Sequence, residues 1–185
     1  ARPADTTLAA MKLFGFSIGW AFCGYLASVI AIAALLHRLR DLPRFFSLVS
    51  LPGTIGHELL HWLVGTLALA KPVKVSLLPK FHRDGSATLG YVMFSNIRWY
   101  NALWVGFAPL LALPAALMLV YYRSMQIPPL HALEFVWGYI AASLVYSCLP
   151  SKADVGIVLS KPAGLIVYLG TAVMLCWAWF YSNPR

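Results

Sequence analysis

Acidic residues are scarce in this chain of 185 residues, which has 6 Asp and Glu against 14 Lys and Arg. The formal net charge is +8, yet the basic residues stand between apolar runs and do not form one block. A nucleic-acid surface would combine a basic stripe with aromatic residues that stack on bases. The pattern therefore argues against a nucleic-acid partner and favours loops that meet the anionic headgroups of a lipid bilayer.

Cysteine is scarce too, and its three positions, Cys23, Cys148 and Cys176, all fall in apolar segments. Such cysteines are typical of small buried hydrophobic residues, which excludes a disulfide framework and leaves the redox compartment open. Apolar residues, by contrast, make up 61% of the chain, well above the usual share of about 45–50% in soluble proteins. We expect an integral membrane protein whose residues 1–185 form a single membrane-embedded domain.

Five apolar runs predict a mainly α-helical, polytopic fold with about five transmembrane segments. The first run, residues 13–36, would reach about 36 Å as a helix, enough to cross a hydrocarbon core of about 30 Å. It is longer than the apolar stretch of about 7–15 residues in a secretory signal, so we expect it to be retained. The other four runs are residues 45–70, 99–122, 130–149 and 163–181.

Between the second and third runs the apolar period changes from helical to alternating. A turn-like segment, His82–Ser86, separates two such stretches, which predicts a β-hairpin over Lys71–Phe94 at the membrane surface. An exposed hairpin edge could pair with an extended segment of another chain. A plain connector between two spans is the alternative. The candidate substrate-binding residues are Val73, Val75, Leu77, Leu89 and Tyr91.

The second run contains the motif His57-Glu58-Leu59-Leu60-His61. On a helix, His57 and His61 would project from one face, about 40° apart around the axis. Neutral imidazole suits zinc, and a catalytic zinc site needs three protein ligands and one open position. Glu58 would then act as general base toward water. Chance is a poor explanation, because unpartnered ionisable groups in an apolar segment cost several kcal/mol.

Helix-perturbing residues precede this motif at Pro52, Gly53 and Gly56. They predict a kink or a re-entrant start before the helix that carries the histidines. Glycine at these positions would also open space for water or substrate.

The third zinc ligand is either Asp154 or Glu134, since few other acids lie in or beside apolar runs. Glu134 comes soon after Pro128-Pro129, near a helix start, where the helix dipole favours a carboxylate without a metal. Asp154 lies at the far end of the same run, where the dipole disfavours an acid and a cation would explain it. We expect His57, His61 and Asp154 on the metal, with Glu134 as the alternative third ligand.

The order of these pieces resembles the site-2 protease family of intramembrane zinc metalloproteases. The resemblance covers about residues 45–160, so the runs at 13–36 and 163–181 are additions. It implies a zinc endopeptidase that hydrolyses peptide bonds in or near a transmembrane segment of a protein substrate. The pieces are His57-Glu58-Leu59-Leu60-His61, the hairpin, Gly106-Phe107-Ala108-Pro109, and Leu149-Pro150-Ser151-Lys152-Ala153-Asp154-Val155-Gly156.

The chain departs from the family pattern at several positions. Ala108 stands where members usually have Gly, Ala112 where they have Asn, and Ala153 and Val155 flank Asp154 in place of Leu and Gly. The alternative reading is a catalytically inactive pseudo-protease that serves as a binding or assembly subunit of a membrane complex.

Basic residues also predict an orientation. With a cytoplasmic N-terminus and five spans, the side that carries the hairpin holds most of them, which favours a cytoplasmic active site. The cluster at Arg38–Arg44 would then lie on the other side and argues against it. We expect the plasma membrane of a bacterium or archaeon, with a membrane-protein or membrane-proximal peptide as substrate and partner membrane subunits as a further possibility.

Overall fold

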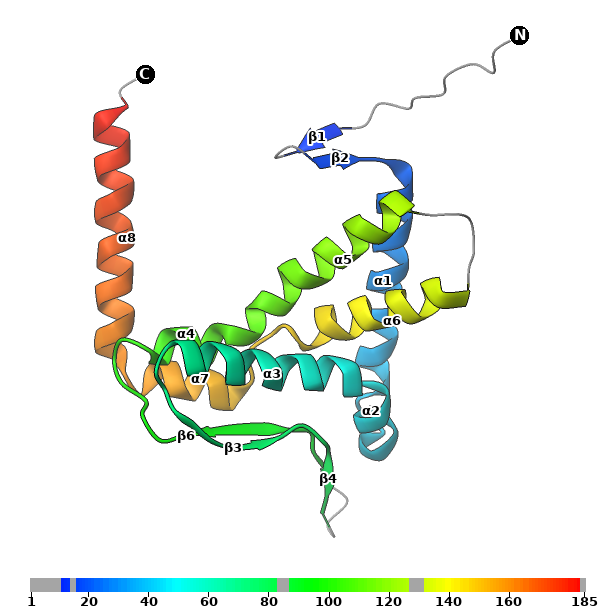
Figure 1. Ribbon diagram of the computed structural model, residues 1–185, viewed down its shortest axis with the longest axis horizontal. Helices are drawn as coiled ribbons and strands as arrows, with labels where there is room; N and C mark the ends of the chain where they lie inside the picture. Colours follow the sequence, from blue (N-terminus) through cyan, green and yellow to red (C-terminus); the bar gives the residue numbers. More distant parts are fainter. Residues whose placement is uncertain (1–10, 14–15, 83–86, 127–131, 184–185) are drawn as a thin grey trace.

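Helices dominate the computed structural model, which describes residues 11–13, 16–82, 87–126 and 132–183 (Figure 1). The mainly α-helical class predicted from the sequence is therefore confirmed. In chain order the helices are α1 Trp20–Leu39, α2 Pro43–Val49, α3 Leu51–Leu67, α4 Ala102–Phe107, the 3-10 helix η1 Ala108–Leu111, α5 Ala112–Gln126, α6 Ala132–Ser147, α7 Lys152–Leu159 and α8 Pro162–Ser182.

Short antiparallel strand pairs complete the fold. The predicted hairpin is present in two parts: β3 (Pro72–Ser76) pairs with β6 (Tyr91–Phe94), and β4 (Lys80–Phe81) pairs with β5 (Ala87–Thr88). Residues 83–86 of the predicted turn lie outside the described residues. A third pair joins β1 (Met11–Leu13) to β2 (Phe16–Ile18).

The first apolar run does not begin as a helix at residue 13, as the sequence predicted. It begins in β1 and β2, and α1 starts at Trp20 after the extended N-cap residue Gly19. Glycine is costly inside a helix, whereas aromatic and β-branched residues such as Phe16 and Ile18 suit a strand. Helix α1 therefore starts directly after Gly19.

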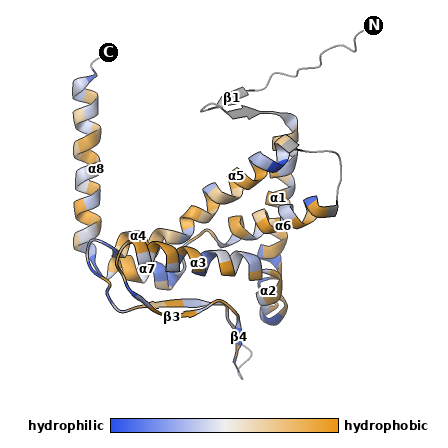
Figure 2. Cartoon of the chain, in the orientation of Figure 1, coloured by the Kyte–Doolittle hydropathy of each residue, from blue (hydrophilic) through white to orange (hydrophobic). Residues whose placement is uncertain are grey.

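Among the described residues, three helical segments are long and apolar enough to cross a membrane, namely residues 20–39, 102–125 and 162–182. A fourth candidate is the pair formed by residues 133–147 and 152–159, which is bent by 44°. The expected five spans are not confirmed, because the second run is split into α2 and the 17-residue α3. A span needs about 20 residues. Figure 2 colours much of α8 as hydrophobic, and large apolar residues of this helix such as Ile166, Met174 and Trp177 are exposed, as expected for a helix that faces lipid.

The break between α2 and α3 falls at Ser50, and Pro52 lies in the first turn of α3, where a missing N–H is tolerated. The predicted kink is therefore present. The glycines that follow do not open space for water or substrate, however. A Cβ on Gly53 would lie 2.2 Å from the Ser143 carbonyl oxygen of α6, and one on Gly56 would lie 2.6 Å from Leu144. They let α6 pack tightly against α3 instead.

This close approach of α3 and α6 positions the motif. The two helices run in the same direction along their contact, so Gly53 meets Ser143 and, one turn later, His57 meets Ser147. In Figure 1, α3 lies across the molecule at a large angle to α1 and α8. Strands β3 and β6 lie against α3 from the other side, where Phe94 contacts Gly65. The motif helix is thus held between a helix and a sheet.

Gly53→Ala is expected to destabilise the protein by about 1–3 kcal/mol, the usual cost of overpacking a tight contact. The added methyl would overlap the backbone of Ser143, which cannot rotate away. Gly24→Ala in α1 is the matched control, because a Cβ there has nothing within 4 Å. The control should be neutral or slightly stabilising. Thermal or denaturant unfolding in detergent micelles would measure both, and equal stability of the two variants would refute the tight α3–α6 contact.

Candidate metal centre

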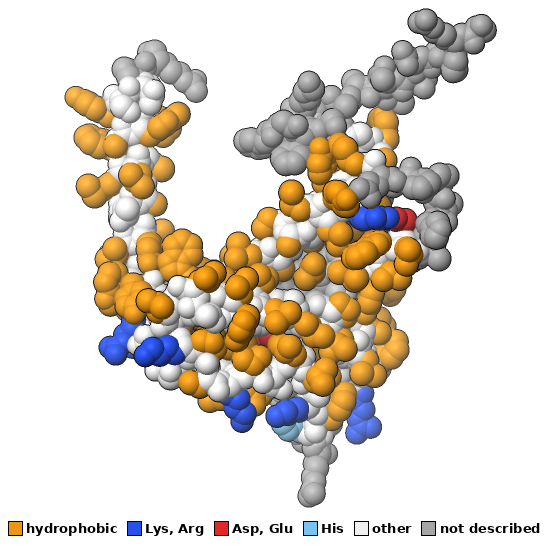
Figure 3. Space-filling model, in the orientation of Figure 1, with side chains coloured by type: hydrophobic (Ala, Val, Ile, Leu, Met, Phe, Trp, Pro, Cys, Tyr) orange, Lys and Arg blue, Asp and Glu red, His pale blue; other side chains and the backbone are white. Residues whose placement is uncertain are grey.

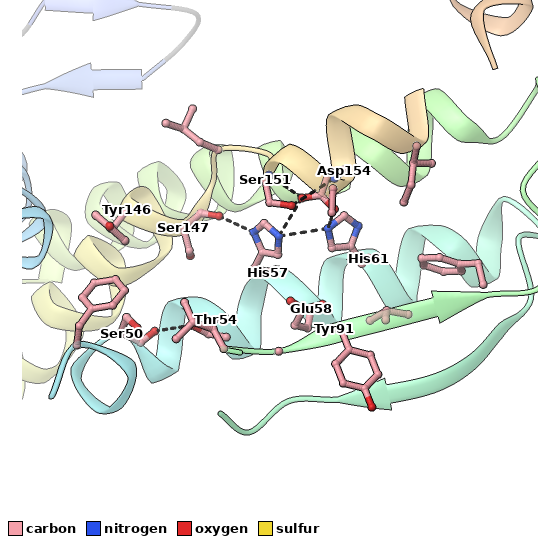
Figure 4. Close-up of a pocket in the computed structure, with 18 residues that line it drawn as sticks. Ser50, Thr54, His57, Glu58, His61, Tyr91, Tyr146, Ser147, Ser151 and Asp154 are labelled. Carbon is pink, nitrogen blue, oxygen red and sulfur yellow. Dashed lines mark hydrogen bonds and ion pairs between the residues drawn. The ribbon is translucent and has the colours of Figure 1, made fainter. Parts of the chain in front are cut away.

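Helix α3 directs His57 and His61 toward the helix that carries Asp154, and Glu58 toward the hairpin (Figure 4). The Nε2 atoms of the two histidines are 3.2 Å apart, and the ring of His61 is buried. Two neutral imidazoles whose Nε2 lone pairs face each other at this distance repel unless a proton or a cation lies between them. The pair therefore has the geometry of a shared ligand site.

Backbone carbonyls orient both rings. The Nδ1 atom of His57 lies 2.7 Å from the Ser147 carbonyl oxygen, and that of His61 lies 2.9 Å from the Val105 carbonyl oxygen. A carbonyl only accepts hydrogen bonds, so each Nδ1 carries the proton and donates it. Each Nε2 is left with its lone pair directed at the other ring, which is the arrangement that metal-binding histidines adopt.

Asp154 completes the group from helix α7. Its Oδ1 lies 3.0 Å from Nε2 of His61, and its Oδ2 lies 3.4 Å from Nε2 of His57. Within the part of the chain that the structure describes, these residues form the one cluster of three or more His, Cys, Asp or Glu that could hold a metal ion. Its ligand atoms all lie within 4.8 Å of one another.

Asp154 is held in place by its own helix terminus. It is the third residue of α7, and its carboxylate accepts a hydrogen bond from the Ser151 backbone N–H at 2.7 Å. In return, the Ser151 hydroxyl accepts from the Asp154 N–H. Asp154 does not lie at the unfavourable end of a helix, as the sequence predicted. A new helix starts at Lys152, so the helix dipole favours the carboxylate.

Glycine also brings α7 to the site. A Cβ on Gly106 of α4 would lie 2.7 Å from the Asp154 carbonyl oxygen and 2.5 Å from Val158. Val105, the residue before this glycine, supplies the carbonyl that orients His61. The close contact between α4 and α7 thus positions Asp154, a candidate ligand, together with the Val105 carbonyl that orients His61.

The three side chains are of types that bind zinc, and they lie close enough together to share one ion. Ligands about 2.0–2.1 Å from a tetrahedral centre lie about 3.3–3.4 Å from one another. The two Nε2 atoms are 3.2 Å apart here, and each faces a different oxygen of Asp154, at 3.0 Å for His61 and 3.4 Å for His57. Two imidazole nitrogens and one carboxylate oxygen are a common ligand set for a catalytic zinc, with the fourth position left open. Ligands of this kind could also hold other divalent transition metals.

Glu134, the alternative third ligand, is not part of this group. It lies in the first turn of α6 and forms an ion pair with Arg123 of α5. The Arg123 guanidinium also lies over the ring of Trp137, 5.9 Å from its centre. These contacts agree with the structural role predicted for Glu134 from its position near a helix start.

A cavity of about 440 Å³ opens beside the candidate metal ligands. The Glu58 side chain lines it and packs against Gly90 of the hairpin, where a Cβ would lie 2.7 Å from Glu58 Cγ. The glycine thus leaves room for the carboxylate next to the histidines. Glu58 is buried but still borders open space, as a general base that acts on water would need to.

Only one strand of the hairpin borders this cavity. Of the five residues predicted to bind substrate, Leu89 and Tyr91 line it. Val73, Val75 and Leu77 do not, and the first two are exposed on β3. The structure therefore does not place these three at the cavity, because β6 lies between β3 and the cavity.

Tyr91 contributes backbone and not its ring to the cavity wall. In Figure 4 its ring points away from the histidines. The ammonium groups of Lys74 and Lys80 lie 5.7 and 5.5 Å from the ring centre, on the outer face of the sheet. Hydrogen bonding to Lys74 lowers the pKa of the Tyr91 phenol.

Several residues of the site were missed by sequence reasoning. The carbonyls of Ser147 and Val105 carry no sequence signal, since every residue has one. Ser50 and Thr54, which line the cavity, could have been found, because they lie seven and three residues before His57 on the same helical face.

No protein-family model, curated protein or solved structure matches the chain.

Proposed function

We propose that the protein is a membrane-embedded zinc endopeptidase that cuts a peptide bond in or near a transmembrane segment of another protein. The observation that carries this proposal is the convergence of two oriented histidines and one carboxylate beside a buried glutamate. These four groups line one cavity that is open to a ligand. His57, His61 and Asp154 would hold the metal.

The roles of the side chains follow from their positions. A zinc ion bound here would polarise the scissile carbonyl and lower the pKa of a water to about 7. Glu58 would take the proton of the attacking water and pass it to the leaving amine, as a general base that becomes a general acid. The Ser147 and Val105 carbonyls would keep both histidines in the tautomer that binds metal.

A peptide must be extended to reach the site, because the amides of a transmembrane helix are already bonded within the helix. Strand β6 is paired with β3 on one side only, and residues on and next to it line the cavity. An extended segment could add to the free edge of β6 and place its backbone beside Glu58. This supports β6, and not β3, as the strand that would hold the substrate.

The distribution of charge supports a cytoplasmic site. Figure 3 shows Lys and Arg side chains along the edge of the molecule that carries α2, the hairpin and the start of α8. The end of α1 lies at this edge too (Figure 1), so Arg38–Arg44 belong with the hairpin and not opposite it. The conflict in the sequence-based count arose because α2 and α3 were counted as a span. By the positive-inside rule, this edge would face the cytoplasm.

Cleavage in cells would test the proposed function directly. Expression of the chain in bacteria should create new N-termini in membrane proteins, located within or beside transmembrane segments, relative to cells without it. Mass spectrometry of protein N-termini measures this. A chain that binds zinc but produces no new N-termini would favour the assembly-subunit reading over the peptidase.

Single prolines along β6 should stop cleavage at alternate positions while zinc is retained. Antiparallel strands direct successive N–H groups to opposite edges, so only alternate residues could bond a substrate backbone, and proline has no N–H. At the intervening positions proline should instead weaken the β3–β6 pair and lower stability. Lys74→Ala and Ser76→Ala remove side chains on β3 and should leave cleavage unchanged. Full activity with proline at every β6 position would exclude substrate capture by this strand.

A further inference from the structure

The cavity extends well past the metal ligands, along the face of α3 toward its start. Its volume of about 440 Å³ far exceeds the space of about 30 Å³ that one water occupies. Beyond His57 its wall is formed by side chains of α2, α3 and α6, and Figure 4 shows Ser50 and Thr54 on the side of His57 away from His61. The walls of this end are Phe46, Ser50, Thr54, Tyr146, Ser147 and Leu149.

The far end combines an aromatic wall with a free hydroxyl. The rings of Phe46 and Tyr146 pack edge to face, with centres 5.5 Å apart. Ser50 is 3% exposed, and its hydroxyl has no hydrogen-bond partner among the described residues. Thr54 differs, since its hydroxyl already donates to the Ser50 carbonyl. A buried hydroxyl without a partner is costly, so Ser50 Oγ is available to a group that enters the cavity.

The distance to the metal ligands suits a peptide side chain. Ser50 precedes His57 by seven residues, which is about 10 Å along the helix axis. An extended peptide advances about 3.3 Å per residue, so the third residue from the scissile bond would lie level with Ser50. No Lys or Arg among the described residues lines the cavity, so an acidic side chain would be buried there without a counter-ion.

We propose that this end of the cavity, bounded by Phe46, Ser50 and Tyr146, is a side-chain subsite for the third residue from the scissile bond. It takes an uncharged side chain that can hydrogen-bond, such as that of Asn, in preference to an isosteric apolar or an acidic one. The inference rests on the proposed peptidase function and names a feature of its substrates.

Peptide hydroxamates test the subsite without cleavage, because a hydroxamate group chelates zinc. The probes are alanine-based peptides whose third residue from the hydroxamate is Asn, Leu or Asp, with the hydroxamate at either end in two series. Isothermal titration of the zinc-loaded full chain in detergent micelles gives each Kd. In one of the two series, the Asn probe should bind about three- to tenfold more tightly than the Leu probe, which is the usual worth of one neutral hydrogen bond. The Asp probe should bind more weakly than either.

Ser50→Ala should remove the preference for Asn over Leu and leave the affinity for the Leu probe unchanged. The variant should fold, since the Ser50 side chain makes no cap hydrogen bond to α3. Ser47→Ala is the matched control. Ser47 is also buried, its hydroxyl already donates to the Arg44 backbone carbonyl, and it does not line the cavity. That control should keep the preference.

The outcomes separate the subsite from the metal site. Equal affinity for Asn and Leu probes in both series, with hydroxamate binding retained, would overturn the subsite and leave the peptidase proposal intact. An undiminished preference in Ser50→Ala would also overturn it. Failure of every hydroxamate to bind the zinc-loaded chain would overturn both proposals together.

Discussion

Glu58→Gln is expected to abolish cleavage while zinc stays bound. The amide has nearly the shape of the carboxylate but cannot accept a proton from water, and general base catalysis is worth about 10²–10⁴-fold in rate. Glu58 does not belong to the group of metal ligand atoms, so zinc content should remain that of the unmodified protein. The measurement pairs elemental analysis of the purified variant with its rate on a substrate found by N-terminal mass spectrometry.

Glu134→Gln is the matched control for this experiment. It makes the same chemical change in a carboxylate that is paired with Arg123 and is not part of the metal group. Cleavage per zinc-loaded molecule should be unchanged, although the lost ion pair should lower the free energy of unfolding. Wild-type cleavage by Glu58→Gln would show that the proposed base is wrong. Loss of activity in Glu134→Gln at full zinc occupancy would reopen its role in the site.

Asp154→Asn is expected to weaken zinc binding by more than about 100-fold, since even outer partners of metal ligands are worth about 10–100-fold. The asparagine oxygen can still accept the hydrogen bond from the Ser151 N–H, so the start of α7 should be preserved. Only the charge and the ligand are removed. A zinc competition titration measures the affinity, and circular dichroism checks that helix content is unchanged.

Asp154→Ala and Asp41→Asn serve as comparisons for this result. Asp154→Ala removes the cap as well as the ligand and should cost about 1 kcal/mol of stability in addition to the zinc. Asp41→Asn changes an exposed acid beside Arg40 and should alter neither property. His57→Ala and His61→Ala should resemble Asp154→Asn in zinc affinity. If Asp154→Asn binds zinc as tightly as the unmodified protein, the third ligand is a different residue.

Local sequence was sufficient for the parts of the site that lie on one helix. His57 and His61 share a helix face because they are four residues apart, and Glu58 is covalently next to the first of them. The hairpin was equally readable, since its alternation of apolar and polar residues is a local pattern. Which of its strands borders the cavity was not readable, because that depends on how the hairpin lies relative to α3 and α7.

Asp154 shows how a residue can be chosen for a wrong reason. The sequence predicts one helix that continues up to Asp154, whereas α6 ends at Ser147 and a separate helix begins at Lys152. Ser151-Lys152-Ala153-Asp154 is a capping-box arrangement with Asp at its fourth position. That local signal was available in the sequence. The span count failed similarly, because apolarity alone does not distinguish one span from α2 and α3 separated at Ser50.

The sequence by itself determined that this chain is apolar and mainly helical, and that two histidines and a glutamate share one helical turn, because those properties depend on composition and on spacing along one element. Tertiary structure alone decided which carbonyls orient the histidines, that Asp154 and not Glu134 meets them, and that the cavity continues to Ser50. Each of these depends on the approach of two elements distant in sequence. Gly53 and Gly106 permit that approach, and nothing in the local pattern shows which helix a glycine will face.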